Sequence, residues 1–260
     1  MINPGRAVLL AAVVLCSRPL AAAGTMLICT DTNFWYPFTF VKDDRSAGLH
    51  VDIAALALER LGLASEFQPM PWKRCLHDAE QGAVDAVVSA SWQEARAAFL
   101  HYPPDAAQPA PSRWRVSQVE YVVVTAAGRP YEYDGDPRSL PQPVRAPYGY
   151  SVVDDLRQAG IEVEVAPGDQ NNLRKLVRDG TGSVVTIPEI VSWLLKDPEF
   201  AGKLRVSARP ITSKSYYFAI SRKSAVAPEM REKIWAEIAR IRDDEKIMER
   251  LAAPYAHSTN

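Results

Sequence analysis

The sequence lacks three features that often indicate a function: an excess of one charge, many cysteines and long apolar runs. Its 260 residues carry 30 basic and 31 acidic side chains. Phosphate binding depends on a concentrated basic surface, so this balance gives no reason to expect nucleic acid as a partner. Runs of one charge and low-complexity tracts are also absent. What is present is apolar: hydrophobic residues make up 47% of the chain, enough for one large or two modest packed domains.

The first residues form a short apolar run behind a positive charge. Arg6 precedes apolar residues 7–16, and three alanines at 21–23 offer small residues for cleavage. This pattern predicts a secretory signal peptide over residues 1–23. The run is about half of the roughly 20 residues that span a bilayer, and no later segment is apolar enough to do so. We therefore expect a mature protein that is soluble outside the cytoplasm.

Cysteine is scarce, with three residues in the whole chain. Cys16 would mark a lipid-anchored terminus only after a small residue, and Leu15 before it is bulky. The mature chain keeps Cys29 and Cys75, which in an oxidising compartment allow one intramolecular disulfide. Two buried free thiols are the alternative, because the sequence does not give the distance between the two Cα atoms.

From Met26 onward, short apolar runs alternate with amphipathic stretches. Residues 26–30, 65–70 and 84–90 are predicted as strands. Helices are predicted from Asp52, taken as an N-cap, to Gly62, and from Pro71 to Gly82. A strand–helix–strand–helix–strand series predicts an α/β fold with a mostly parallel sheet and right-handed crossovers.

A second unit of the same kind follows a loop at 101–115 that contains four prolines. After a strand at 119–125, strands are predicted within 143–151, 161–166 and 183–188, and helices at 153–160, 171–180 and 189–197. A strand at 214–222 and a largely helical segment at 227–256 end the chain. The apolar stripe of that last segment needs a sheet to cover it. We expect it to pack on the first unit, giving lobe 1 at 24–118 and 216–260 and lobe 2 at 119–215.

Two facing α/β lobes create a cleft at the carboxyl ends of their strands, where ligands bind and hinge motion closes the site. The loops at these ends are rich in aromatic, hydroxyl and arginine side chains, the composition of a small-molecule pocket. They contain Phe34, Trp35, Tyr36, Trp72, Arg74, Ser89, Ser91, Trp92, Arg96, Tyr148, Tyr150 and Ser151. Structural interpretations stay open: the aromatics at 34–36 as a cap on the core, Ser151 as a helix N-cap, and Arg96 as an exposed helix residue. For Arg74 we prefer exposure.

The order of these segments resembles a known family. TDTNFWYPF, GLHVDIAALALERLG, VDAVVSASWQEARAAF, APYGYS and QNNLRKLVRDG follow one another as in the periplasmic solute-binding proteins of the amino-acid ABC-transporter type, the family 3 extracellular solute-binding proteins. The resemblance extends from Leu27 to about Tyr255. It implies a two-lobed periplasmic-binding-protein fold with two hinge strands, a ligand between the lobes and a permease partner in the inner membrane. It implies no enzymatic chemistry, and we expect a monomer without cofactor or metal.

The resemblance also implies roles for single residues. An aromatic that covers the ligand matches Trp35 or Phe34, hydroxyls that bond its carboxylate match Ser89 and Ser91, and a bidentate arginine matches Arg96. With the cleft aromatics and lobe 2 residues added, the candidate ligand-binding set is Phe34, Trp35, Trp72, Ser89, Ser91, Trp92, Arg96, Tyr150, Ser151 and Glu189.

Three positions depart from the family pattern. Gln93 stands where a threonine is usual, Ser183 where a strand aspartate is usual, and Pro188 near the place of the aspartate that binds the α-amino group. Proline has no charge and no side-chain acceptor. Either the adjacent Glu189 supplies this carboxylate, or the ligand lacks an ammonium group.

Two other functions share this fold. A cyclohexadienyl dehydratase-like enzyme needs a general acid or base in the cleft, for which Glu189 and His101 are the candidates. A periplasmic sensor binds a solute and signals through a partner protein. A metal site is not expected, because His50, His77, His101 and His257 show no ligand spacing.

Overall fold

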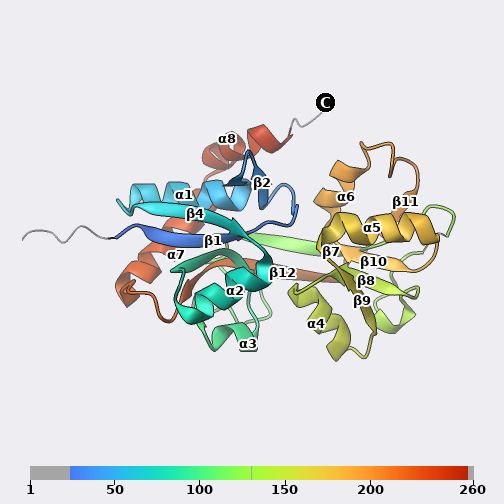
Figure 1. Cartoon of the computed structure of the whole chain (residues 1–260), viewed down its shortest axis with the longest axis horizontal. Coiled ribbons are helices and arrows are strands. Elements are labelled where there is room, and N and C mark those ends of the chain that lie inside the picture. The colour runs from blue at the N-terminus through green and yellow to red at the C-terminus, as the bar shows by residue number, and fades with distance from the viewer. Residues whose placement is uncertain (1–23, 130, 257–260) are drawn as a thin grey trace, which may run out of the picture.

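A computed structural model of the chain describes residues 24–129 and 131–256. The signal peptide predicted at 1–23 lies outside these described residues. The chain forms two α/β lobes that lie side by side along the longest axis of the molecule (Figure 1). The predicted fold class is confirmed.

Lobe 1 has a sheet of order β4-β1-β5-β12, in which β1 pairs in parallel with both β4 and β5. The helix ends that local sequence encodes are confirmed: Pro71 is the N-cap of the second helix, and Gly82 its C-cap in the left-handed conformation. The elements are β1 (Met26–Asp31), β2 (Phe40–Lys42), β3 (Arg45–Ala47), α1 (Leu49–Arg60), β4 (Ser65–Met70), α2 (Trp72–Gln81), β5 (Ala86–Ser91), α3 (Glu94–Ala97) and β6 (Leu100–His101).

The start of α1 corrects one prediction. The helix begins at Leu49 with Gly48 as N-cap, so Asp52 lies inside the first turn and is not the cap. Gly48 has a φ of 120°, and a Cβ there would lie 2.3 Å from the carbonyl oxygen of Phe38. Only glycine fits both constraints. The Asp52 carboxylate instead accepts a hydrogen bond from Tyr255 near the C-terminus, 2.5 Å away.

Lobe 2 continues the sheet in the order β7-β10-β8-β9, with β10, β8 and β9 parallel. Its first α-helix, α4, begins at Ser151 with Tyr150 as N-cap, so the interpretation of Ser151 as the cap was wrong by one residue. The elements are a 3₁₀ turn (Pro137–Ser139), β8 (Val144–Pro147), α4 (Ser151–Gln158), β9 (Val163–Ala166), α5 (Gly168–Asp179), β10 (Ser183–Thr186), α6 (Pro188–Leu194) and β11 (Leu204–Val206).

Two long antiparallel strands, β7 (Ser117–Ala126) and β12 (Thr212–Ser221), run between the lobes (Figure 1). β12 pairs with β5 in lobe 1, and β7 pairs with β10 and β11 in lobe 2. The lobe boundaries expected at 118/119 and 215/216 fall inside these strands. The division at those residues stays a prediction.

The chain ends in α7 (Pro228–Asp243) and α8 (Glu245–Ala256), which return to lobe 1 (Figure 1). Ile234, Ile238 and Ile241 of α7 are fully buried in one cluster with Ile28 of β1. The predicted packing of this helix on the first lobe is confirmed. None of the helices in the described part of the chain is long and apolar enough to cross a bilayer.

A disulfide joins Cys29 in the middle of β1 to Cys75 in α2, with the two Cα atoms 5.5 Å apart. Both cysteines are fully buried. The pairing was one of two alternatives left open by the sequence, and it ties together the strand and the helix whose ends reach the interlobe cleft.

Candidate functional site

A small pocket lies where the lobes meet, at the carboxyl ends of β1 and β5. Its volume is about 30 Å³, room for about one or two water molecules. Its lining comes from both lobes: Asp31, Trp35, Thr39, Trp72, Ser89, Ser91, Arg96, Tyr150, Ser151 and Tyr216. With the lobes in this position the pocket is too small to hold a solute much larger than water.

Arg96 is a buried cation in this pocket. The short helix α3 turns the chain back after β5, so that Arg96 is only 5% exposed. Its Nη1 donates to the carbonyl and the hydroxyl of Ser91 at 3.1 and 3.0 Å, and its Nη2 to the carbonyl of Gly149 at 3.3 Å. Among the described residues no carboxylate lies within ion-pair distance. A buried charge is costly unless an opposite charge meets it, so this arginine is suited to an anionic ligand.

Asp31 is a buried carboxyl in the same pocket, and sequence reasoning missed it. It ends β1, is 6% exposed, and accepts hydrogen bonds from the Tyr150 hydroxyl at 2.9 Å and from the backbone N–H of Asn33 at 2.9 Å. Burial raises the pKa of this carboxyl, and these hydrogen bonds oppose the rise. No lysine or arginine of the described chain forms an ion pair with it. The signal was present in TDTNFWYPF as a carboxylate at a strand end.

Direct bonds join the two lobes around the pocket. The hydroxyls of Ser91 and Ser151 lie 2.7 Å apart, and Trp72 Nε1 donates to the carbonyl of Gly149 at 3.0 Å. Gly149 has a φ of 81°, and a Cβ there would lie 3.3 Å from the Trp72 ring, so glycine allows this close approach. The lobes are therefore in contact at the site itself.

Aromatic rings wall the pocket. Trp35 lies 4.8 Å from Tyr216 and 6.3 Å from Tyr150, measured between ring centroids. The indole Nε1 of Trp35 is buried and has no hydrogen-bond partner within the part of the chain that the structure describes. A ligand acceptor would satisfy this donor.

Three residues of the predicted set do not line this pocket. Phe34 packs against Trp193 of α6, with centroids 4.5 Å apart, and so contributes to an aromatic contact outside the pocket. Glu189 lies in the first turn of α6, where burial raises the pKa of its carboxyl and its Oε2 has no partner among the described residues. Trp92 lines a separate, larger pocket. Their roles in binding stay predictions.

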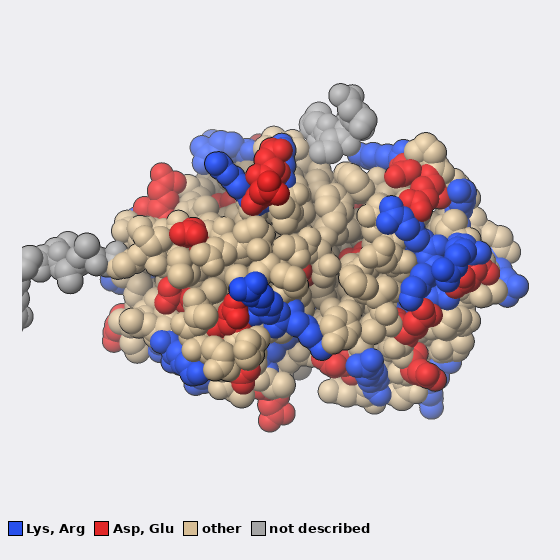
Figure 2. Space-filling view, viewed as in Figure 1, with Lys and Arg blue, Asp and Glu red and all other residues tan. Residues whose placement is uncertain are grey.

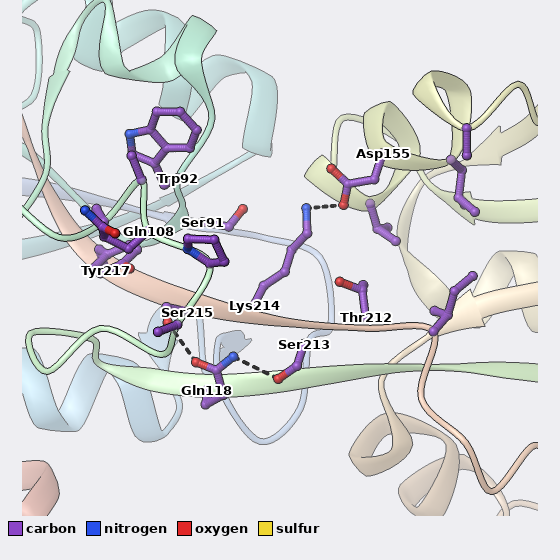
Figure 3. A pocket seen from close by; sticks show the side chains of 18 of the residues that line it. Ser91, Trp92, Gln108, Gln118, Asp155, Thr212, Ser213, Lys214, Ser215 and Tyr217 are labelled. Carbon is purple, nitrogen blue, oxygen red and sulfur yellow. Dashed lines mark hydrogen bonds and ion pairs between the residues drawn. The ribbon is translucent and has the colours of Figure 1, made fainter. Parts of the chain in front are cut away.

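The larger pocket, of about 450 Å³, lies beside the hinge strands (Figure 3). Lys214 of β12 crosses it to form an ion pair with Asp155 of α4, and its Nζ donates to the hydroxyl of Ser151 at 2.9 Å. Ser91 lines both pockets, so the Ser91–Ser151 pair stands between them. The hinge strand is thus tied to the helix that carries part of the candidate site.

The remaining candidates have structural positions. Arg74 is exposed and pairs with Asp78 one turn along α2, as we preferred. His101, in β6, does not line the small pocket between the lobes, and neither does Glu189, so neither candidate acid or base of the dehydratase hypothesis lies there. Within residues 24–129 and 131–256, no group of three or more His, Cys, Asp or Glu side chains could hold a metal ion.

Asp169, in the first turn of α5 in lobe 2, is a second buried carboxyl. It is 2% exposed and accepts a hydrogen bond from Thr186 at 2.5 Å. Burial raises its pKa to about 7, and the nearby charge of Asp31 adds to the rise. Because the folded pKa lies above that of an unfolded aspartate, the folded state holds the proton more tightly, and stability from this group falls as the pH rises from about 4 to about 7.

We expect Asp169→Asn to flatten this part of the pH dependence. The amide keeps an oxygen that can accept from Thr186 but cannot ionise. The melting temperature of the variant relative to the native protein should increase as the pH rises from about 4 to about 7. Thermal unfolding at several pH values measures this, with Asp134→Asn, an exposed carboxyl, as the control. A difference that does not change with pH would contradict the assignment.

Comparison with known proteins gave matches at the level of family and fold. The model of the bacterial extracellular solute-binding proteins, family 3, matches residues 26–252. A search of curated protein sequences gave no match. A histidine kinase sensor domain with similarity to periplasmic binding proteins superposes with a TM-score of 0.72 at 20% identity, covering 90% of this chain and 96% of that one.

Two further solved structures are similar. The arginine-, lysine-, histidine-binding protein ArtJ from the thermophilic bacterium Geobacillus stearothermophilus gives a TM-score of 0.70 at 15% identity, covering 89% of this chain and 95% of that one. An ancestral amino acid-binding protein, a precursor of cyclohexadienyl dehydratase, gives 0.66 at 15% identity with the same coverage, 89% and 95%. At these identities the likeness shows a shared fold.

Proposed function

The chain belongs to family 3 of the bacterial extracellular solute-binding proteins, and on that premise we propose that it captures a small carboxylate-bearing solute, an amino acid or a close relative, between its lobes. The protein works in the periplasm as a monomer and delivers the closed complex to an ABC-type permease in the inner membrane. The observation that carries the proposal is Arg96, a buried guanidinium with no ion-pair partner in the described chain.

The charged side chains of the pocket restrict the class of ligand further. Arg96 suits a carboxylate, because a guanidinium can bind both oxygens at once. Asp31, at the end of β1, suits a cationic group, and Arg96 reaches the same pocket from the short helix α3 that follows β5. The ligand therefore carries both charges. Asp31 supplies a carboxylate in a cleft where Pro188 provides none, so the departure at Pro188 does not require a ligand without an ammonium group.

A thermal-shift screen of protein purified from the periplasm tests the ligand class. We expect stabilisation by L-amino acids, and much less by the matching amines and keto acids, which lack one charge. A ligand at 100 times its Kd adds about 2.7 kcal/mol of stability, roughly a 5–10 °C rise for a chain of this size. Equal stabilisation by amines and amino acids would contradict the carboxylate requirement.

Asp31→Asn tests the second charge. The amide has nearly the same shape and can still accept from Tyr150, but it carries no charge. We expect affinity for ammonium-bearing ligands to fall about 10- to 100-fold, the loss of a charged hydrogen bond of about 1.5–3 kcal/mol, with little change for keto acids. Calorimetric titration measures both. Asp43→Asn, in the exposed β2–β3 turn, is the matched control, and equal losses in the two variants would refute the role of Asp31.

Transport and sensing make different genetic predictions. Deleting the gene should abolish uptake of the radiolabelled ligand that the thermal-shift screen identifies, if the protein serves a permease. The alternative is a sensor, a role suggested by the similar fold of the kinase sensor domain. In that case the deletion should leave uptake unchanged and abolish a transcriptional response to the ligand.

A further inference from the structure

A buried histidine lies directly behind the pocket. His50, in the first turn of α1, is fully buried and does not line the pocket itself. Its Nδ1 lies 2.8 Å from the hydroxyl of Ser89, which does line the pocket, and its Nε2 lies 2.7 Å from the hydroxyl of Ser117 at the start of the hinge strand β7. The imidazole thus bridges a pocket hydroxyl and a hinge hydroxyl.

The surroundings keep this ring neutral. It stacks on Phe38, with centroids 4.7 Å apart, and lies near Trp35 and Tyr216 at 5.6 and 6.4 Å. Its polar contacts are the two serine hydroxyls, and none of the carboxylates that the structure describes bonds to it. Burial lowers its pKa to about 3. A neutral imidazole has one N–H donor and one nitrogen acceptor, so one serine must donate to the ring and the other must accept from it.

We infer that His50 is held as the Nδ1–H tautomer by a hydrogen bond from Ser117, and that it thereby fixes Ser89 as a donor toward the ligand. In this arrangement Ser89 accepts from Nδ1–H and keeps its own proton, and it has no other side-chain partner in the described part of the chain. In the other tautomer the Ser89 hydroxyl would donate its hydrogen bond to Nδ1 of the ring, and only its lone pairs would face the pocket.

The inference rests on the proposed function, because the Ser89 hydroxyl would donate its hydrogen bond to the carboxylate of the bound ligand. The hydroxyl proton would add a neutral donor to the charged donors of Arg96 on the same ligand group. His50 acts through Ser89 and is a positioning residue, and Ser117 places the start of the hinge strand in the same chain of bonds. Ser117 is also paired with Tyr216 where β7 and β12 run antiparallel, and Tyr216 lines the pocket.

The tautomer can be measured directly. In protein labelled with ¹⁵N-histidine and purified from the periplasm, long-range ¹H–¹⁵N correlation spectra distinguish a protonated Nδ1 from a protonated Nε2, and loss of the signal in His50→Asn assigns it. We expect Nδ1–H in the native protein and a rise of the Nε2–H form in Ser117→Ala, which lacks the donor. An Nε2–H ring in the native protein overturns the inference, whether or not a ligand is known.

Two variants test the effect on binding, with L-glutamine, L-arginine and L-lysine as probes. His50→Asn can place an amide N–H near the position of Nδ1 and should keep affinity within about 3-fold, whereas His50→Gln places it nearer Nε2 and should lower affinity about 10-fold. Equal affinity in His50→Gln and the native protein refutes the positioning role. If none of the three probes binds the native protein, the proposed function fails for these ligands, and the tautomer measurement still decides the inference.

Discussion

Arg96→Ala is expected to abolish ligand-induced thermal stabilisation while the protein stays folded. The guanidinium is the one cation among the residues that line the small pocket between the lobes, and losing a charged partner to a buried carboxylate costs on the order of 2 kcal/mol or more, a loss of about 30-fold or more in affinity. Differential scanning fluorimetry and calorimetric titration with an amino acid from the screen measure the loss.

Two variants serve as controls for Arg96. Arg74→Ala removes an exposed arginine of the same lobe, whose partner Asp78 is on the same helix, and should leave binding unchanged. Arg96→Lys keeps the charge without the bidentate geometry and should recover only part of the affinity. Native-like stabilisation of Arg96→Ala by the same ligand would remove Arg96 from the site.

Replacing both disulfide cysteines is expected to give the largest loss of stability. Cys29 and Cys75 are 46 residues apart in the sequence, and closing such a loop restricts the unfolded chain. Cys29→Ala/Cys75→Ala should lose about 2–4 kcal/mol, a fall in melting temperature of roughly 5–15 °C. Alanine is used because a serine hydroxyl in this fully buried place would add a cost of its own.

The native protein with and without reductant is the matched comparison. Reduction should lower its melting temperature toward that of the double alanine variant, which itself should not respond to reductant. Mass spectrometry of the unreduced protein should show a mass lower than that of the reduced protein by two hydrogen atoms. A double variant as stable as the oxidised protein would show that the disulfide contributes little.

The fold could be predicted where the signal is local. Pro71 and Gly82 fix the ends of α2 through their own backbone preferences. The alternation of apolar runs with amphipathic segments predicted parallel strands in lobe 1, and β1 is parallel to both β4 and β5. The start of α1 could not be predicted in this way. Gly48 is required by the carbonyl of Phe38, a contact that exists only after the chain has folded.

Part of the pocket lining could be predicted from the alternation of side chains along a strand. Ser89 and Ser91 point to the same side of β5 because side chains alternate along a strand, so both line the small pocket between the lobes, whereas Trp92, the next residue, lines only the larger pocket, which Ser91 also borders. Glu189 was chosen for its place beside Pro188, but the direction of its side chain is set by where α6 begins. Asp31 could not be predicted in this way, because its burial and its hydrogen bond from Tyr150 exist only once lobe 2 lies against the end of β1.

The surface adds little to these arguments. Lysine, arginine, aspartate and glutamate are interspersed over the face shown in Figure 2, without a large area of one sign. This agrees with the near-zero net charge of the sequence.

The carbonyl of Gly149 accepts hydrogen bonds from both Trp72 and Arg96 of the opposite lobe. A main-chain oxygen is present whatever residue the codon specifies, so substitutions elsewhere in lobe 2 leave it in place, and substitutions of Gly149 itself add the strain of a side chain at a φ of 81°. Side-chain substitution will therefore assign the energy of this contact entirely to the two donors in lobe 1. Only replacement of the peptide bond after Gly149 by an ester, which weakens the acceptor, would recover the share that belongs to lobe 2.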